Sequence, residues 1–212
     1  YVVMVSQLTA INIAKMITIA IVIGLIALVG IADQRQILYA CMHISYCVWW
    51  LLEQRIYPER RTFLFQEKVG PVGLTSAILI IGVFYSLPAF LAFFNPDPLT
   101  IAATATALPL FYFGSLINTS ADVQKMTAKT LGRDLVSDGI WSHVRHVNYS
   151  GDLMRYLSFA IIAGSAWAFL VPLAITALYL QRIGEKEKSM SDKYSDFASY
   201  RQHSTRLIPW IW

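Results

Sequence analysis

The chain has 212 residues, of which 56% are hydrophobic and only 14% are charged. Soluble domains carry about 25% charged residues, so this composition excludes an ordinary soluble protein and predicts one embedded in a membrane. The formal net charge is +4, and the basic residues flank apolar runs, which indicates contact with membrane lipids and no nucleic-acid partner. Cys41 and Cys47 lie in one apolar run and predict neither a metal site nor a disulfide framework. We expect an all-α integral membrane protein.

Five apolar runs predict the membrane segments. The last run, 153–181, would extend roughly 43 Å as one helix, which exceeds the hydrocarbon core of about 30 Å. Gly164 and Pro172 favour a break within it, so we expect two short helices there and about six transmembrane helices in all. The other four runs are 8–32, 37–52, 70–94 and 99–117.

The distribution of lysine and arginine predicts the sidedness of these helices. The connectors 53–69 and 118–147 and the tail 182–206 are basic, whereas 33–36 and 95–98 carry one arginine between them. Basic connectors stay on the cytosolic side. We therefore expect both termini on the cytosolic or equivalent side of an endoplasmic reticulum, plastid or bacterial inner membrane. The basic residues of the first two connectors include Arg55, Arg60, Arg61, Lys68, Lys125, Lys129, Arg133 and Arg145.

The pattern divides the chain into a four-helix membrane scaffold, 1–117, and a second region, 118–212, in which polar and apolar pieces alternate. Thr119 or Ser120 is expected to cap a new helix at the start of the second region. Residues 131–134 include a glycine and are expected to end that helix. The tail 182–200 predicts an amphipathic cytosolic helix, and the aromatic ending 207–212 predicts an anchor at the membrane interface.

Residues 139–152 form a dense polar cluster directly before the last apolar run. Their side chains can grip an anion at a membrane boundary, which suits a phosphate-bearing cofactor beside a hydrophobic lipid substrate. Plainer explanations stay open, because the cations can reach lipid headgroups, Asn148 can cap the following helix and Tyr149 can be an interface aromatic. The candidates for cofactor binding here and in the flanks are Lys125, Arg145, His146, Asn148, Tyr149, Asp152 and Arg182.

The second region resembles the C-terminal part of the membrane sterol reductases and steroid 5-alpha-reductase-like proteins. In that superfamily the cluster typically reads Arg-His-Pro-Asn-Tyr-x-Gly-Asp or Glu after a Gly-x-Trp, and Arg145 here begins Arg-His-Val-Asn-Tyr-Ser-Gly-Asp. Val147 thus replaces the usual proline, and the family's Arg-x-x-Arg-Asp-Glu appears as Arg182-Ile-Gly-Glu-Lys-Glu187. The other matching pieces are 121–125, 193–194 and 206–212.

The resemblance implies NADPH-dependent reduction of an activated carbon–carbon double bond in a sterol, steroid or isoprenoid-like lipid. It adds Glu187 and Tyr194 to the residues expected at the cofactor. Related isoprenylcysteine carboxyl methyltransferases and phospholipid methyltransferases share much of this architecture but bind S-adenosylmethionine, so methyl transfer is an alternative. A non-catalytic membrane subunit that binds lipid, pigment or protein partners is another.

A reductase also needs a proton donor, and a tyrosine phenol suits an apolar site because it is neutral there. Tyr46 with His43, one helical turn away, is the first catalytic candidate, and Tyr149 with Asp152 is the second. The plainer explanation of the first pair, as satisfied core residues that pack within the membrane helices, stays open. Lys15 lies within the first apolar run, and its ammonium group is expected to reach the membrane surface.

Overall fold

The computed structural model describes residues 4–59 and 65–212, so Arg60 and Arg61 lie outside the described residues. The described elements are helical apart from one two-residue ladder, which confirms the all-α class. The chain forms two compact units, and each is described by itself. Unit 1 comprises Tyr1–Ala105 and Phe159–Val171, and unit 2 comprises Thr106–Ser158 and Pro172–Trp212. The division expected at residue 117 stays a prediction.

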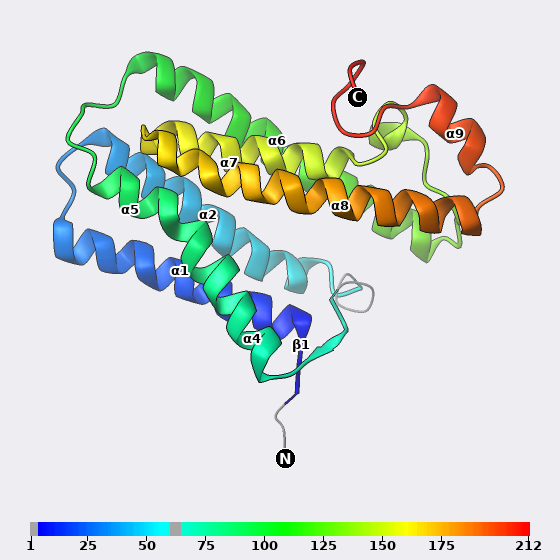
Figure 1. Cartoon of the computed structure of the whole chain (residues 1–212), viewed down its shortest axis with the longest axis horizontal. Coiled ribbons are helices and arrows are strands. Elements are labelled where there is room, and N and C mark those ends of the chain that lie inside the picture. Colours follow the sequence, from blue (N-terminus) through cyan, green and yellow to red (C-terminus); the bar gives the residue numbers. More distant parts are fainter. Residues whose placement is uncertain (1–3, 60–64) are drawn as a thin grey trace. The chain divides into compact units, whose positions relative to one another are not determined.

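Unit 1 begins with a helical hairpin of α1 (Gln7–Val29) and α2 (Gln34–Ile56), which lie side by side (Figure 1). The Ser6 hydroxyl caps α1 by accepting a backbone N–H at 3.1 Å. Gly30, at a φ of 81°, ends that helix. Asp33 then begins α2 with a capping box. Because these stop and start signals are only a few residues apart, the two helices must pack antiparallel.

The third apolar run forms one irregular rod over residues 71–93. Pro88 lacks an N–H and its ring excludes a regular α-helical turn before it, which accounts for the π and 3-10 geometry there. The hydroxyls of Ser86 and Thr18 donate to the Gly82 carbonyl at 2.6 and 3.3 Å. The elements are α4 (Pro71–Ala77), η1 (Ile78–Val83), η2 (Phe84–Ser86) and α5 (Leu87–Phe93), after β1 (Val5–Ser6) and β2 (Lys68–Val69), which pair antiparallel.

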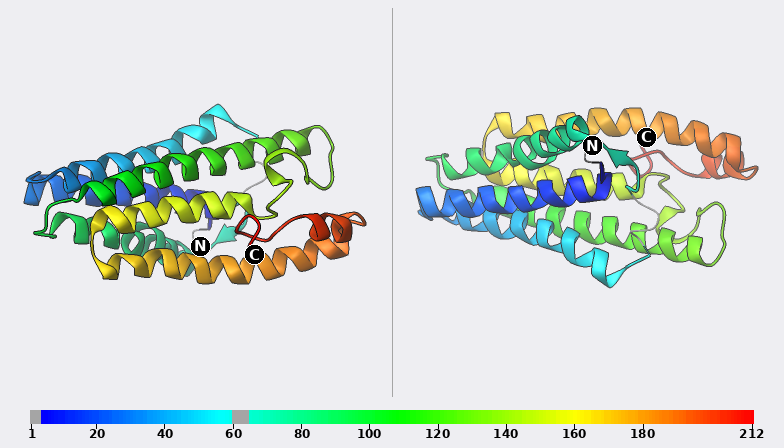
Figure 2. Two further views of the ribbon diagram at one scale, coloured as in Figure 1. Left: turned by 90° about the horizontal axis from the view of Figure 1, so that it is seen from above. Right: turned by 90° about the horizontal axis from the view of Figure 1, so that it is seen from below.

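Three long helices have residues in both units, and two of them contact each other through glycines in unit 2. A Cβ on Gly151 would lie 2.6 Å from the Gly114 carbonyl oxygen, and one on Gly114 would lie 2.5 Å from the Gly151 oxygen. Only glycine permits this approach. Figure 2 shows α7 between α6 and α8. The elements are α6 (Ile101–Thr130), η3 (Gly139–Trp141), α7 (Val147–Ala163), η4 (Ala166–Phe169), α8 (Leu170–Lys193) and α9 (Phe197–His203).

The long apolar run 153–181 does break into two helices, and the break is at Gly164, which has a φ of 68°. Two side chains of unit 1 satisfy the carbonyls at the end of α7. Asn95 Nδ2 donates to the Ala163 and Gly164 oxygens at 3.0 and 3.2 Å, and Arg35 Nη1 donates to the Ile162 oxygen at 2.6 Å. Pro172 does not contribute to this break, because it lies in the first turn of α8 where its missing N–H costs little.

Two helix boundaries expected in the second region are also wrong. α6 continues through Thr119 and Ser120, so neither caps a new helix. The side chains change there from apolar to polar, but no glycine or proline interrupts the backbone, so the helix continues. α8 likewise continues to Lys193, and the amphipathic tail is therefore the end of α8 followed by α9. The expected stop at 131–134 is confirmed, since α6 ends at Thr130 and Gly132 has a φ of 76°.

Four helical stretches of the described residues are long and apolar enough to cross a membrane: Gln7–Val29, Pro71–Phe93, Ile101–Thr130 and Ala166–Lys193. α2 and α7 are helical too, but they carry buried polar side chains along their length. The protein is therefore an all-α membrane protein. The number of six spans stays a prediction.

Candidate functional site

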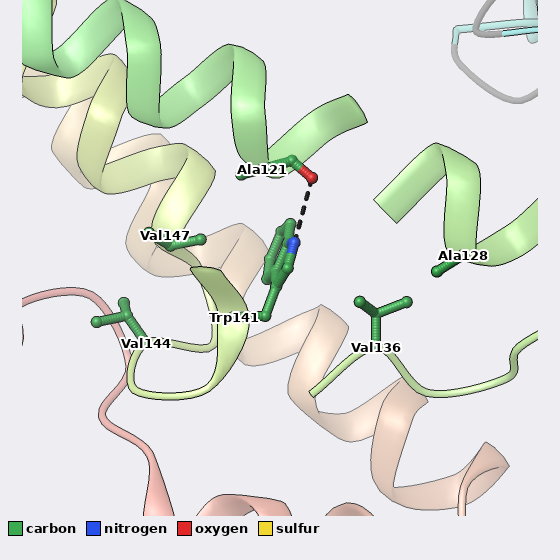
Figure 3. Close-up of a cluster of buried hydrophobic side chains, with 6 residues drawn as sticks. All are labelled: Ala121, Ala128, Val136, Trp141, Val144 and Val147. Carbon is green, nitrogen blue, oxygen red and sulfur yellow. Dashed lines mark hydrogen bonds between the residues drawn. The ribbon is translucent and has the colours of Figure 1, made fainter. Parts of the chain in front are cut away.

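Trp141 anchors the polar cluster within unit 2. Its indole Nε1 donates to the Ala121 carbonyl at 3.1 Å, which ties the segment to α6 (Figure 3). The ring is only 4% exposed. Val147 is the first residue of α7, a position where a proline is also well suited, and α7 begins there with valine. The packed cluster consists of Ala121, Ala128, Val136, Trp141, Val144 and Val147.

The C-terminal tail pairs with the cluster through the backbone. The Arg145 and His146 N–H groups donate to the Thr205 and Arg206 carbonyls at 2.8 and 3.0 Å, and the Thr205 N–H donates to the His143 carbonyl at 2.8 Å. The sequence did not predict this pairing, because the two segments are about 60 residues apart and carry no strand pattern.

Glu187 gathers the basic residues of this segment. Its two oxygens accept from Arg145 Nε at 2.9 Å and from Arg206 Nε at 3.1 Å. Arg145 Nη1 also donates to the Ser204 carbonyl and hydroxyl. Arg145 and Glu187, both expected at the cofactor, thus bind each other, and Arg145 keeps only Nη2 without an acceptor among the described residues. Their contact with a cofactor stays a prediction.

His146 is buried in the same cluster, with 3% of its surface exposed. Burial lowers its pKa to about 4, the positive charges of Lys186 and Arg145 act in the same direction, and Glu187 opposes them. The imidazole is therefore neutral at pH 7. Its Nε2 lies 3.6 Å from Glu187, which is too long for a hydrogen bond, and the neutral ring makes no ion pair.

Asp152 lies near the start of α7 and is 9% exposed. Its two oxygens accept from Arg155, one turn along α7, and from the hydroxyl of Tyr179 on α8. Tyr149 stacks on Tyr179 with ring centroids 4.1 Å apart and has Lys186 Nζ 4.8 Å from its ring centre. The carboxylate therefore pairs with Tyr179, a partner that the sequence did not predict because no residue spacing relates α7 to α8.

A basic cavity of about 90 Å³ lies within unit 2. Lys125 Nζ is 5.1 Å from the centre of the Trp141 ring, and Lys129 Nζ donates to the Tyr194 hydroxyl at 3.2 Å. Burial raises the pKa of Tyr194, but the bond from Lys129 and that cation's charge outweigh it and lower the pKa overall. The lining residues are Lys125, Lys129, Asp134, Leu135, Val136, Trp141, Arg145, Met190, Tyr194 and Tyr200.

Three of the expected cofactor residues, Lys125, Arg145 and Tyr194, line this cavity, and Lys129 is an addition. A second cavity of about 350 Å³ shares Asp134, Leu135 and Tyr194 with it and adds Arg133, Ser137, Lys193, Ser195 and Asp196. The other candidates do not line either cavity. Asn148 Nδ2 donates to Asp122 Oδ1 at 3.4 Å, and Arg182 is exposed on α8.

The first catalytic pair lies in unit 1. His43 Nδ1 shares a hydrogen bond with the Tyr39 hydroxyl at 2.9 Å, and the His43 ring stacks on Phe159 at 4.5 Å. Lys15 Nζ donates to the Tyr46 hydroxyl at 2.9 Å. Lys15 is 3% exposed, so the expectation that its ammonium reaches the membrane surface is wrong. A polar partner on the neighbouring helix holds it inside the unit instead.

Comparison with known proteins supplies the family. The family described as "Protein of unknown function (DUF1295)" matches residues 71–207, which is more than half of the chain. The chain belongs to the DUF1295 family. It is also similar to a Delta(14)-sterol reductase of Arabidopsis thaliana, with 26% identity over 200 residues, 85% of this chain and 52% of that protein. The Delta(14)-sterol reductase TM7SF2 of Mus musculus is 28% identical over 148 residues, 60% of this chain and 35% of that protein.

These findings confirm the resemblance to sterol reductase-like membrane proteins. The chain spans about half or less of the length of these curated relatives. The DUF1295 match begins at Pro71, earlier than the resemblance found in the sequence, and includes every residue that lines the two cavities. His43 and Tyr46 lie outside it.

Proposed function

We propose that this protein catalyses the NADPH-dependent reduction of an activated carbon–carbon double bond in a sterol, steroid or isoprenoid-like lipid. The observation that carries the proposal is the basic cavity of unit 2, in which three cations and three aromatic rings come together. The two curated relatives are named for sterol reduction, which favours this chemistry over other uses of such a cavity. A membrane protein of this family also has direct access to a hydrophobic substrate.

The residues of the cavity fit a phosphate-bearing dinucleotide. Lys125 and Lys129 offer ammonium groups to phosphate oxygens, and Arg145 offers Nη2. The Trp141 and Tyr194 rings offer faces on which a planar ring system can stack. The smaller cavity suits a phosphate group, and the larger one that adjoins it offers room for more of the molecule.

NADPH, when bound, supplies the hydride for the reduction. The chain has to supply the binding cations, exclude water and deliver one proton to the other carbon of the double bond. We assign that proton to a tyrosine hydroxyl. Tyr46 is the first candidate because Lys15 holds its oxygen, and the Tyr149 and Tyr179 pair beside Asp152 is the second. The π electron pair forms the new bond to the proton, so one hydride and one proton balance the reaction.

A binding experiment tests the cofactor. Purified protein in detergent should bind NADPH and not S-adenosylmethionine. Lys125→Met should weaken NADPH binding by about 1–3 kcal/mol, the scale of one charge-assisted hydrogen bond. Lys188→Met is the matched control, because Lys188 is exposed on α8 and lines neither cavity. Binding of S-adenosylmethionine alone would favour methyl transfer, and binding of neither would favour a non-catalytic subunit.

We also propose that both termini face the cytosolic or equivalent side of the membrane. Single cysteines at Glu59 and Arg133 should then react with a membrane-impermeant reagent from one side, and a cysteine at Asp97 from the other. All three positions are exposed. The background should lack both native cysteines, because Cys41 is exposed. Labelling of Glu59 and Arg133 from opposite sides would contradict the topology.

A further inference from the structure

α1 carries a buried lysine, Lys15, within its apolar sequence. Lys15 is the ninth residue of α1, roughly 12 Å along the axis from the helix start. Its side chain is 3% exposed. Ionisable groups inside membrane helices are costly and are retained mainly where they have a partner and a function. In the proposed reduction this lysine is only a neighbour of Tyr46.

The contact of Lys15 with Tyr46 has a defined direction. Lys15 Nζ lies 2.9 Å from the Tyr46 hydroxyl oxygen and 4.0 Å from the centre of its ring. An ammonium group has three N–H donors and no lone pair, so it can only donate. The phenol oxygen therefore accepts, and its own hydrogen has to point to another acceptor. This arrangement suits a phenol that gives its proton away.

The neighbouring rings hold the Tyr46 side chain in place. The rings of His43 and Tyr46 are stacked with centroids 6.3 Å apart, and Phe159 lies 6.1 Å from the Tyr46 ring and 4.5 Å from the His43 ring. Tyr39 and His43 share a hydrogen bond at 2.9 Å. Residues 39, 43 and 46 recur with the helical period and therefore occupy one face of α2. The phenol oxygen is the point where this face meets the lysine of α1.

We propose that Lys15 is a positioning residue for Tyr46 as proton donor, which rests on the proposed reductase function. As hydride reaches one carbon of the substrate double bond, the O–H bond of Tyr46 breaks and a C–H bond forms at the other carbon. The phenolate that remains is stabilised by the ammonium group that already donates to its oxygen. Water returns the proton to Tyr46 after the reduced lipid leaves. Lys15 itself forms and breaks no covalent bond in this step.

The test is a double-mutant cycle on turnover with NADPH and a steroid or isoprenoid enone. Tyr46→Phe and Lys15→Met should each lower turnover by about 100-fold, the lower end for general acid catalysis, and leave the Kd for NADPH near wild type. The double variant should be no slower than Tyr46→Phe alone, because Lys15 acts through the phenol that is already gone. Lys15→Arg keeps the charge and a donor, and should recover turnover to within about 10-fold of wild type.

Thr18→Val is the matched control. Thr18 is buried in the same helix, 1% exposed, and its hydroxyl donates only to backbone carbonyls, so turnover should stay unchanged. Wild-type turnover of Lys15→Met, or losses from Lys15→Met and Tyr46→Phe that multiply, would overturn the role of Lys15 and leave the reductase proposal standing. Absence of any reduction by the wild-type protein with NADPH bound would overturn both. Near-native circular dichroism and NADPH affinity separate these outcomes from misfolding.

Discussion

Replacement of Glu187 tests whether this residue serves the cofactor or the architecture of unit 2. The Glu187 and Arg145 side chains are 8% and 5% exposed, and they pair at 2.9 Å. Loss of one partner of a buried ion pair leaves the other charge uncompensated, which costs about 3–5 kcal/mol. Glu187→Ala should lower the free energy of unfolding by this amount. Glu187→Gln should cost less, because its amide oxygen can still accept from Arg145.

The second partner of Glu187 provides an internal comparison. The Arg206 side chain is 37% exposed and pairs with Glu187 at 3.1 Å. Solvent screens such a pair, so Arg206→Ala should cost about 1 kcal/mol or less. Glu187→Ala removes the carboxylate and both of its contacts, whereas Arg206→Ala removes only the exposed contact, so Glu187→Ala should cost more.

Thermal unfolding in detergent, followed by circular dichroism, measures both effects. For a protein of about 200 residues each kcal/mol shifts the midpoint by about 2–4 °C, so Glu187→Ala should melt roughly 10 °C below wild type. The folded variant at low temperature should still bind NADPH with a Kd within about threefold of wild type, since both partners of the Glu187 carboxylate are side chains of the protein itself. A melting point within 2 °C of wild type, or a Kd weakened at unchanged stability, would refute the architectural role.

Four further variants test single features of unit 2. Gly151→Ala should destabilise by about 3 kcal/mol or more because its Cβ would meet backbone atoms of Gly114, whereas Gly184→Ala, with nothing within 4 Å in α8, should stabilise by up to about 1 kcal/mol in the same melting assay. The folded pKa of His146, about 4, lies below its ordinary 6.5, so the unfolded chain takes up the proton first. Its contribution of about 3 kcal/mol is therefore complete above pH 6.5 and is lost as the pH falls to 4, a slope that His146→Gln should flatten. Trp141→Phe deletes a buried 3.1 Å hydrogen bond and should lower the unfolding free energy by about 1 kcal/mol, and an unchanged value would contradict the anchoring role.

The sequence by itself determined the class of the molecule and most of its helices. Apolar runs of membrane length identify the helices because burial in lipid depends on composition averaged over about 20 residues. Gly164 and the 131–134 segment correctly predicted two helix ends, because glycine readily adopts the positive φ that ends a helix. Thr119 and Pro172 did not mark helix ends. A threonine can cap a helix but also fits inside one, and a proline fits in the first turn of a helix.

Tertiary structure alone decided how the candidate residues are paired. Arg145 and Glu187 were both found in the sequence, but only the folded chain brings them together and adds the tail that accepts from Arg145. Tyr179 and Lys15 acquire their partners across two helices, at separations of 27 and 31 residues. Periodicity describes one helix at a time and states which face a side chain occupies. Which side chain meets it depends on the register and rotation of the neighbouring helix, and packing of the whole unit sets both.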